Sequence, residues 1–190
     1  LDIDGSWDDL MSMPYLKSLV ISICDLDPAD GLHFAAALAN NKNQSLQRLS
    51  VAGNYRMSTS IPKLIQVACT RLVELDCSFC DVNNKIQTQV FEILATQQNC
   101  TLRSLKIQAI RVNNADALAE CIRHNTSLER LILDHPREPF PVDLSVFERL
   151  SKALQYNYYL QILRLDTMAP QYLAPQDRQA IQQMQFWLQL

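Results

Sequence analysis

The chain has 190 residues, of which 48% are hydrophobic and 19% are charged, and 17 Lys and Arg against 20 Asp and Glu give a formal net charge of -3. This composition is too hydrophobic and too weakly charged for an intrinsically disordered protein. It also lacks the basic excess that is usual in proteins that bind nucleic acid. No apolar run is long enough to span a membrane, and the first residues show no signal-peptide pattern.

A pattern of Leu, two residues, Leu, one residue and a further apolar position recurs six times along the chain. Its second and third apolar positions are two residues apart, which is the period of a β-strand. A longer unit alternates with a shorter one, so that alternate copies are separated by 56 or 58 residues. The first leucines of the six expected strands are Leu16, Leu46, Leu72, Leu102, Leu128 and Leu160.

Between these strands the apolar residues follow a helical period. A unit of one strand and one helix cannot bury its own apolar side, so we expect the units to stack, with parallel strands on one side and helices on the other. Strands lie about 4.8 Å apart and packed helices about 8–10 Å apart, so the stack should bend toward its sheet. The expected helical stripes are Leu32, Ala35, Leu38 and Ala39; Ile61, Leu64, Ile65 and Ala68; Ile86, Val90, Ile93 and Leu94; Leu118, Ala119 and Ile122; and Leu144, Phe147, Leu150 and Leu154.

This arrangement resembles the leucine-rich repeat superfamily, and within it the ribonuclease-inhibitor-like class. The resemblance covers Leu16 to Leu165 and includes the turn position eight residues after each first leucine, where Cys24, Asn54 and Cys80 follow in order. It implies an α/β fold, a right-handed horseshoe-shaped solenoid of about six repeats with caps. The parallel sheet would line the concave face and the helices the convex face.

The resemblance implies a single leucine-rich-repeat domain over 1–190. Residues 1–15 would form an N-terminal cap or partial repeat, 16–173 the repeats and 174–190 a C-terminal capping helix, because the ends of a solenoid need covers. That last helix could instead present Phe186 or Trp187 to a partner. The later units depart from the pattern, with Ile110, Pro136 and Met168 at the turn position and three prolines between 135 and 141 that predict a reshaped loop.

Cys77 and Cys80 form a C-x-x-C motif, which by itself could indicate a zinc or redox site. The repeat register places both side chains in the core, and no second cysteine pair has the spacing of metal ligands. We therefore expect no metal and no cofactor. Cys69, Cys100 and Cys121 are interpreted as small hydrophobic core residues with free thiols.

Three Asn-x-Ser/Thr sequences begin at Asn43, Asn99 and Asn125, and each ends directly before the first leucine of a unit. They could be glycosylation sites, but Asn also suits helix ends and tight turns. We interpret them as helix-to-strand turns.

No motif of a known catalytic site is present in the sequence. His135 follows Asp134, but no nucleophile is placed near this pair, and we interpret it as a solvated turn histidine. The sequence therefore predicts that the chain is not an enzyme and has no small-molecule substrate, and that it binds neither nucleic acid nor membranes.

Residues between the inward leucines should line the concave face, where the scaffold fixes their positions and leaves their chemistry free for recognition. A solvated charged face is the alternative interpretation, while Phe79 and Ile132 favour binding. Phe79 could instead pack into the turn beside Phe140. The predicted partner-binding residues are Arg48, Glu74, Asp76, Phe79, Lys106, Arg130, Ile132, Asp134, Arg164 and Asp166.

We therefore expect a non-catalytic protein–protein interaction scaffold that binds a protein partner through the concave face or adjacent loops. The alternative is a structural repeat module of a larger receptor, translocated effector or multisubunit assembly, because the chain does not begin with Met and its first unit is short. The resemblance allows nucleotide-binding immune receptors, actin-capping tropomodulin-like proteins and translocated bacterial effectors. We expect a cytoplasmic location, reached by delivery into a host cell in the case of a bacterial effector.

Overall fold

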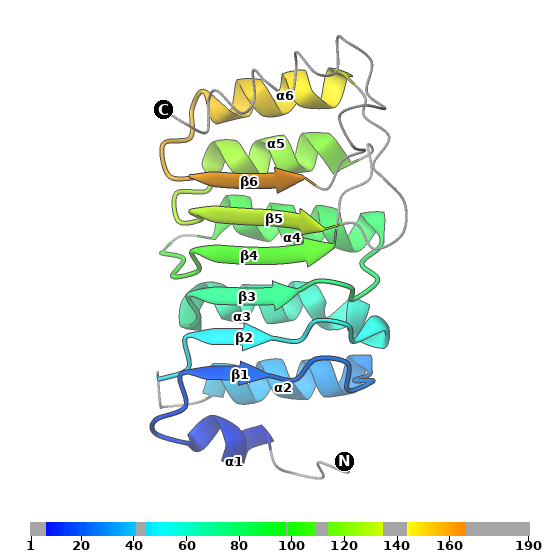
Figure 1. The fold of residues 1–190 in the computed structure, drawn as a ribbon, viewed down its shortest axis with the longest axis vertical. Coiled ribbons are helices and arrows are strands. Elements are labelled where there is room, and N and C mark those ends of the chain that lie inside the picture. Colours follow the sequence, from blue (N-terminus) through cyan, green and yellow to red (C-terminus); the bar gives the residue numbers. More distant parts are fainter. Residues whose placement is uncertain (1–6, 41–44, 98, 109–113, 135–143, 166–190) are drawn as a thin grey trace.

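The structure is a computed structural model that describes residues 7–40, 45–97, 99–108, 114–134 and 144–165. In this part of the chain, parallel strands form one sheet in chain order (Figure 1). The strands are β1 (Ser18–Val20), β2 (Arg48–Ser50), β3 (Glu74–Cys77), β4 (Ser104–Gln108), β5 (Arg130–Asp134) and β6 (Ile162–Leu165). The helices are α1 (Trp7–Ser12), α2 (Pro28–Asn40), the 3-10 helix η1 (Tyr55–Ser60), α3 (Ile61–Arg71), α4 (Asn84–Thr96), α5 (Ala115–His124) and α6 (Leu144–Leu154).

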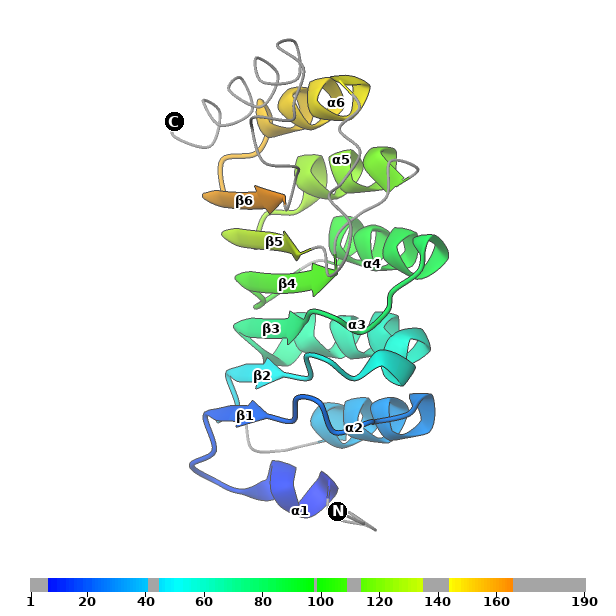
Figure 2. The same ribbon diagram turned by 45° about the vertical axis from the view of Figure 1, so that its right-hand side comes forward.

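Helices α2 to α6 lie along one face of the sheet and leave its other face uncovered by them (Figure 2). The predicted α/β arrangement of parallel strands and helices is confirmed. The second leucines of the units pair across the sheet in register, as the spacing predicted: Leu19, Leu49, Leu75, Leu105, Leu131 and Leu163. None of the described helices has the length and hydropathy needed to cross a membrane.

The hydrophobic core lies between the sheet and the helices. The central strand leucines Leu49, Leu75, Leu105 and Leu131 are at most 2% exposed. The largest buried helix side chains include Phe34, Phe91 and Phe147, which come from α2, α4 and α6. Burying one such side chain stabilises the fold by roughly 1.5–3 kcal/mol, so this layer supplies much of the driving force for stacking.

The predicted apolar stripe of α2 is wrong at Leu32, whose side chain is 49% exposed. The buried face of this helix instead holds Gly31, Phe34, Ala35 and Leu38, a spacing of three, four and seven residues. Phe34 takes the inward position and meets the ring of Trp7 from α1 edge to face, with the ring centroids 5.1 Å apart. Ala35 and Leu38 are buried as predicted, and the prediction missed Gly31 because a glycine is not counted as an apolar position.

Gly31 allows α2 to approach η1 closely. A Cβ atom at this position would lie 2.0 Å from Oγ of Ser60 and 2.8 Å from Cγ of Met57. The Ser60 hydroxyl is buried and donates a hydrogen bond of 2.7 Å to the Met57 carbonyl, so it cannot turn away without losing that bond.

We expect Gly31→Ala to lower the free energy of unfolding by about 1–2 kcal/mol, because the clash outweighs the better helix propensity of alanine. Urea unfolding followed by circular dichroism measures this change. Ala36→Gly, at an exposed position of the same helix, is the control and should cost about 1 kcal/mol through propensity alone. Equal or greater stability of Gly31→Ala would show that the two helices do not approach so closely.

Asn54 provides hydrogen-bond partners for the backbone groups where the chain leaves β2. Its side chain is fully buried and its amide nitrogen donates to the carbonyl oxygens of Ile21 (2.8 Å) and Val51 (2.7 Å). Its amide oxygen accepts hydrogen bonds from the backbone N–H groups of Cys24 (2.9 Å) and Leu26 (3.3 Å). One side chain therefore joins the turns of two successive units.

The other two turn positions differ from each other. Cys80 is buried, and its thiol donates to the Val51 carbonyl oxygen at 3.4 Å, which links its turn to the preceding unit. Cys24 takes the same turn position in the first unit, but its side chain is exposed and its thiol donates within its own turn, to the Ser22 carbonyl oxygen. Among the described strands β1 is the first, so this turn has no described turn before it to join.

The turns that lead from helix to strand are also closed by side chains. Asn125 is 4% exposed, its amide nitrogen donates to the Leu94 carbonyl oxygen at 2.8 Å, and its amide oxygen accepts from the backbone N–H of Leu128 at 2.7 Å. The interpretation of this sequence as a structural turn is confirmed. Asn99 is exposed with a φ of 55°, and Asn43 lies outside the described residues.

Several predictions fall outside the described residues. They concern the proline-rich segment 135–141, the turn positions Ile110, Pro136 and Met168, and the C-terminal helix over 174–190. At the other end, α1 packs against the start of the stack, with Trp7 and Met11 buried. The division of the chain into cap, repeats and capping helix stays a prediction.

Candidate functional site

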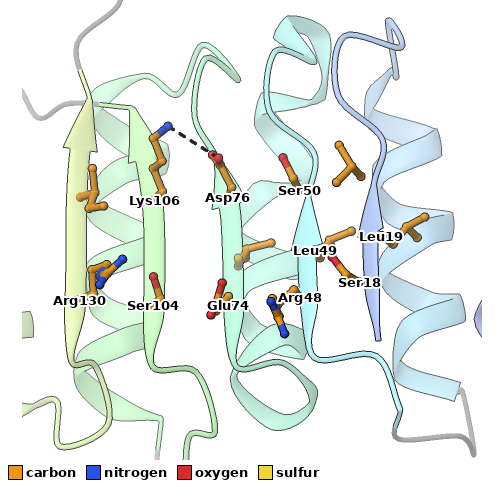
Figure 3. Close-up of a pocket in the computed structure, with 13 residues that line it drawn as sticks. Ser18, Leu19, Arg48, Leu49, Ser50, Glu74, Asp76, Ser104, Lys106 and Arg130 are labelled. Atoms are coloured by element: carbon orange, nitrogen blue, oxygen red, sulfur yellow. Dashed lines mark ion pairs between the residues drawn. The ribbon is translucent and has the colours of Figure 1, made fainter. Parts of the chain in front are cut away.

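We call the sheet surface opposite the helices the open face. Side chains alternate along each strand, so the residues between the inward leucines lie on this face. They surround a depression of about 300 Å³ that crosses β1 to β5 (Figure 3). One row across the strands holds Ser18, Arg48, Glu74, Ser104 and Arg130, and the next holds Val20, Ser50, Asp76, Lys106 and Ile132.

The first row carries three exposed charged side chains, those of Arg48, Glu74 and Arg130. Arg48 and Glu74 are direct neighbours in the register of β2 and β3. Even so, among the ion pairs between described residues none joins any of these three side chains within 4.0 Å. This row therefore presents exposed charges that form no ion pair with another described residue.

The second row does contain an ion pair. Lys106 Nζ lies 3.7 Å from Asp76 Oδ2, and the two side chains are 34% and 32% exposed (Figure 3). Asp76 also accepts a hydrogen bond from the backbone N–H of Ser78 at 2.9 Å and another from the Ser78 hydroxyl. Asp76 is thus fixed by its own strand end, and its charge is shared between the turn and Lys106.

Apolar side chains lie among these charges. Val20 is 69% exposed, Ile162 on β6 is 41% exposed, and Ile132 is half-buried. Val20 and Ile162 were left out of the predicted binding residues, although the same alternation that selected Ile132 placed them on this face. An exposed aliphatic side chain on a charged sheet face is the feature that could have selected them.

A second depression, of about 250 Å³, adjoins the first at the N-terminal ends of β3 to β6 and shares Glu74, Ser104 and Arg130 with it. Arg103 lines it and is held by hydrogen bonds to the carbonyl oxygens of Cys100 (3.1 Å) and Ser127 (3.0 Å). The open face is therefore continuous with a polar edge.

The predicted binding residues separate into three groups. Arg48, Glu74, Asp76, Lys106, Arg130 and Ile132 line the depression together. Arg164 is exposed on β6 and Phe79 is half-buried in the turn after β3, and neither lines it. The backbone of Asp134 lies in β5 opposite Gln108, and Asp166 lies outside the described residues. That these residues bind a partner stays a prediction.

Phe79 does not line the depression because the alternation of side chains along β3 ends before this residue. It has a φ of 57°, in the left-handed region, and Gly53 has a φ of 78° at the equivalent turn position. Ser78, which alternation alone placed on the concave face, is fully buried. The turn geometry therefore decides where both side chains point.

The C-x-x-C motif belongs to the core, as predicted. Cys77 and Cys80 are both fully buried. Burial raises the pKa of the Cys77 thiol, and it raises the pKa of Cys80 to about 11. A thiol with a raised pKa is a poor nucleophile and a poor metal ligand at neutral pH. Within the described residues no three His, Cys, Asp or Glu side chains are grouped so as to hold a metal ion.

Comparison with known proteins gives structural matches and no sequence matches. No family model and no curated protein sequence matches the chain. A solved structure of the tropomodulin C-terminal domain from Caenorhabditis elegans matches with a TM-score of 0.52 and 14% identity, covering 100% of this chain and 92% of that one. A solved structure of leiomodin-1 actin-binding site 2 matches with a TM-score of 0.57 and 12% identity, covering 100% of this chain and 91% of that one.

These matches correct the assignment to the ribonuclease-inhibitor-like class, which is wrong. That assignment depended on the order of Cys24, Asn54 and Cys80, and Cys24 is exposed whereas Asn54 and Cys80 are buried. At 12–14% identity the likeness concerns the fold alone. The chain has an α/β fold with a parallel sheet, similar to the folds of these tropomodulin and leiomodin domains.

Proposed function

We propose that this chain is a non-catalytic protein-binding domain whose partner contacts the open face of the sheet. The observation that carries this proposal is the row of exposed charges at Arg48, Glu74 and Arg130, which no described ion pair neutralises. The core does not need these residues, because packing is supplied by the leucines that alternate with them. Arginines beside exposed aliphatic side chains are frequent anchors of protein interfaces.

Actin is the first partner to test. The matched leiomodin-1 structure is that of an actin-binding site, and the match covers 100% of this chain and 91% of that one. Fold alone does not carry function from one protein to another, so the proposal depends on the open face of this chain. The alternative, a structural repeat module of a larger receptor, translocated effector or assembly, is compatible with the same fold.

We also propose the finer architecture that the repeat spacing implies. The six strand units would form one right-handed, horseshoe-shaped solenoid in a single domain over 1–190, with the open face on its concave side. The regular pairing of successive strands supports this proposal. A cytoplasmic location is proposed with it.

We expect the double substitution Arg48→Glu and Arg130→Glu to weaken binding to actin at least tenfold, because two interface arginines would become repulsive charges. Co-sedimentation with filamentous actin and fluorescence titration with monomeric actin measure this loss. Lys85→Glu with Lys152→Glu is the matched control, since both lysines are exposed on α4 and α6, lie off the open face and form no ion pair with another described residue.

The outcomes test separately whether actin is the partner and whether the open face is the binding surface. If the wild-type chain does not bind actin in either form, the actin assignment is wrong. If it binds actin and the open-face variant binds equally well, the open face is not the binding surface. Loss of binding in both the open-face variant and the control variant would point to a general effect of charge.

A further inference from the structure

Three cysteines gather where the helices end and the following strands begin. Cys69 lies in the last turn of α3, Cys100 precedes β4, and Cys121 lies in α5. Their exposed fractions are 0%, 7% and 1%, and all three are free thiols. The binding face described above uses none of them.

The backbone places Cys69 and Cys100 side by side. The backbone N–H of Thr101 donates a hydrogen bond of 2.6 Å to the Cys69 carbonyl oxygen, and the Thr101 hydroxyl donates to the same oxygen at 3.2 Å. Each Cα atom is two covalent bonds, or about 2.4 Å, from one of the two bonded backbone atoms, so the Cα atoms of Cys69 and Cys100 lie at most about 7.4 Å apart. Disulfides join Cα atoms that are about 4.4–6.8 Å apart, and the two thiols are close enough for each to be the largest influence on the pKa of the other.

The two thiols differ in acidity. The pKa of Cys100 is lowered, chiefly by the hydrogen bond with the Cys69 thiol and also by the Ser127 hydroxyl, the Leu102 backbone N–H and the nearby Arg103 guanidinium, which together outweigh its burial. The pKa of Cys69 is raised by the same thiol–thiol hydrogen bond and by burial. Cys100 is therefore the more acidic thiol of the pair, and it is also the one with a small opening to solvent.

We propose that Cys69 and Cys100 form a peroxide-reactive dithiol that closes to an intramolecular disulfide. The Cys100 thiolate attacks one oxygen of a hydroperoxide, the O–O bond breaks, hydroxide leaves, and Cys100 becomes a sulfenic acid. The Cys69 sulfur then attacks the Cys100 sulfur, the S–O bond breaks, and water leaves with the Cys69 proton. In sum two thiols lose two electrons and two protons, and hydrogen peroxide is reduced to two molecules of water.

The remaining buried thiols provide a comparison inside the same chain. Burial raises the pKa of Cys77 and Cys80, and it raises that of Cys121 to about 12 with a further contribution from Cys100. Their exposed fractions are at most 1%. These cysteines are therefore expected to stay reduced, including the C-x-x-C pair that is closest in sequence.

Digestion with trypsin can show which cysteines become joined by a disulfide. Cleavage after Arg71, Lys85, Arg103 and Arg123 leaves Cys69, the Cys77 and Cys80 pair, Cys100 and Cys121 on different peptides. The experiment treats the whole chain with a small excess of hydrogen peroxide, alkylates the remaining thiols, digests the protein and maps the disulfides by mass spectrometry. We expect a mass about 2 Da lower before alkylation and one cross-link between the Cys69 and Cys100 peptides, removed by dithiothreitol.

Two variants test the order of steps. Cys69→Ser should abolish the cross-link and leave a Cys100 sulfenic acid that dimedone traps, whereas Cys121→Ser should form the cross-link as the wild type does. In the wild type, oxidation should also raise the thermal midpoint by on the order of 5 °C, because the bond closes a long loop. Retention of all six thiols, a Cys77–Cys80 bond, or a cross-link that involves Cys121 would overturn the proposal.

Discussion

Replacing Asn54 with alanine should lower the free energy of unfolding by about 3–5 kcal/mol. The substitution removes two donated and two accepted hydrogen bonds at once, all of them to the backbone. The carbonyl oxygens of Ile21 and Val51 would lose a donor, and the backbone N–H of the buried Leu26 would lose its acceptor. Each stranded buried group costs about 1–3 kcal/mol, and water cannot easily replace a fully buried amide.

Guanidinium unfolding followed by circular dichroism measures this loss. The matched control is Asn83→Ala, because Asn83 is exposed and accepts a single hydrogen bond of 3.0 Å from the Ile86 backbone N–H as the N-cap of α4. Loss of an N-cap costs about 0.5–2 kcal/mol. If the two variants were equally destabilised, Asn54 would not hold two units together in the way that its contacts indicate.

The strand register could be predicted from the sequence because it depends on one strict period. Leu49, Leu75, Leu105 and Leu131 pair in line as their spacing required, since a shift of one residue would turn every leucine to the open face. The helix α2 was less predictable. Its inward face includes Gly31, whose role is close approach to η1, and no apolar pattern marks such a position.

The open face was predictable as far as the strands extend. Alternation selected the six residues that line the depression together, and it failed at Phe79, where the left-handed turn has begun. It could not tell which charges would pair. Asp76 forms an ion pair with Lys106, whereas Arg48 and Glu74 form none within 4.0 Å although their backbones are adjacent, because strand spacing alone does not fix side-chain rotamers.

The cysteines show a different limit of sequence reasoning. The C-x-x-C spacing of Cys77 and Cys80 could by itself indicate a zinc or redox site, yet burial raises the pKa of both thiols. The pair whose thiols influence each other's pKa is Cys69 and Cys100, 31 residues apart. Only the stacking of one unit on the next brings these two side chains together, so local spacing carries no signal for them.

Replacing Leu105 with alanine should lower the free energy of unfolding by about 2–5 kcal/mol, because it opens a cavity in the middle of the stack. Leu105 is fully buried in β4 and lies between Leu75 and Leu131 in the register. Strands hold it on both sides, so the surrounding core cannot collapse onto the space. Urea unfolding followed by circular dichroism measures the loss, and Lys106→Ala, next to it on the open face, should change stability by less than about 1 kcal/mol.

The same substitution at Leu163 tests how the units cooperate. Leu163 is 7% exposed, and in the described part of the chain only β5 pairs with its strand. Its truncation should therefore cost less than that of Leu105, about 2 kcal/mol. In a stack stabilised by neighbour contacts both variants should unfold in one transition, because each unit needs the interface that the next unit provides. A separate early transition for Leu163→Ala would show instead that the last unit unfolds independently of the rest.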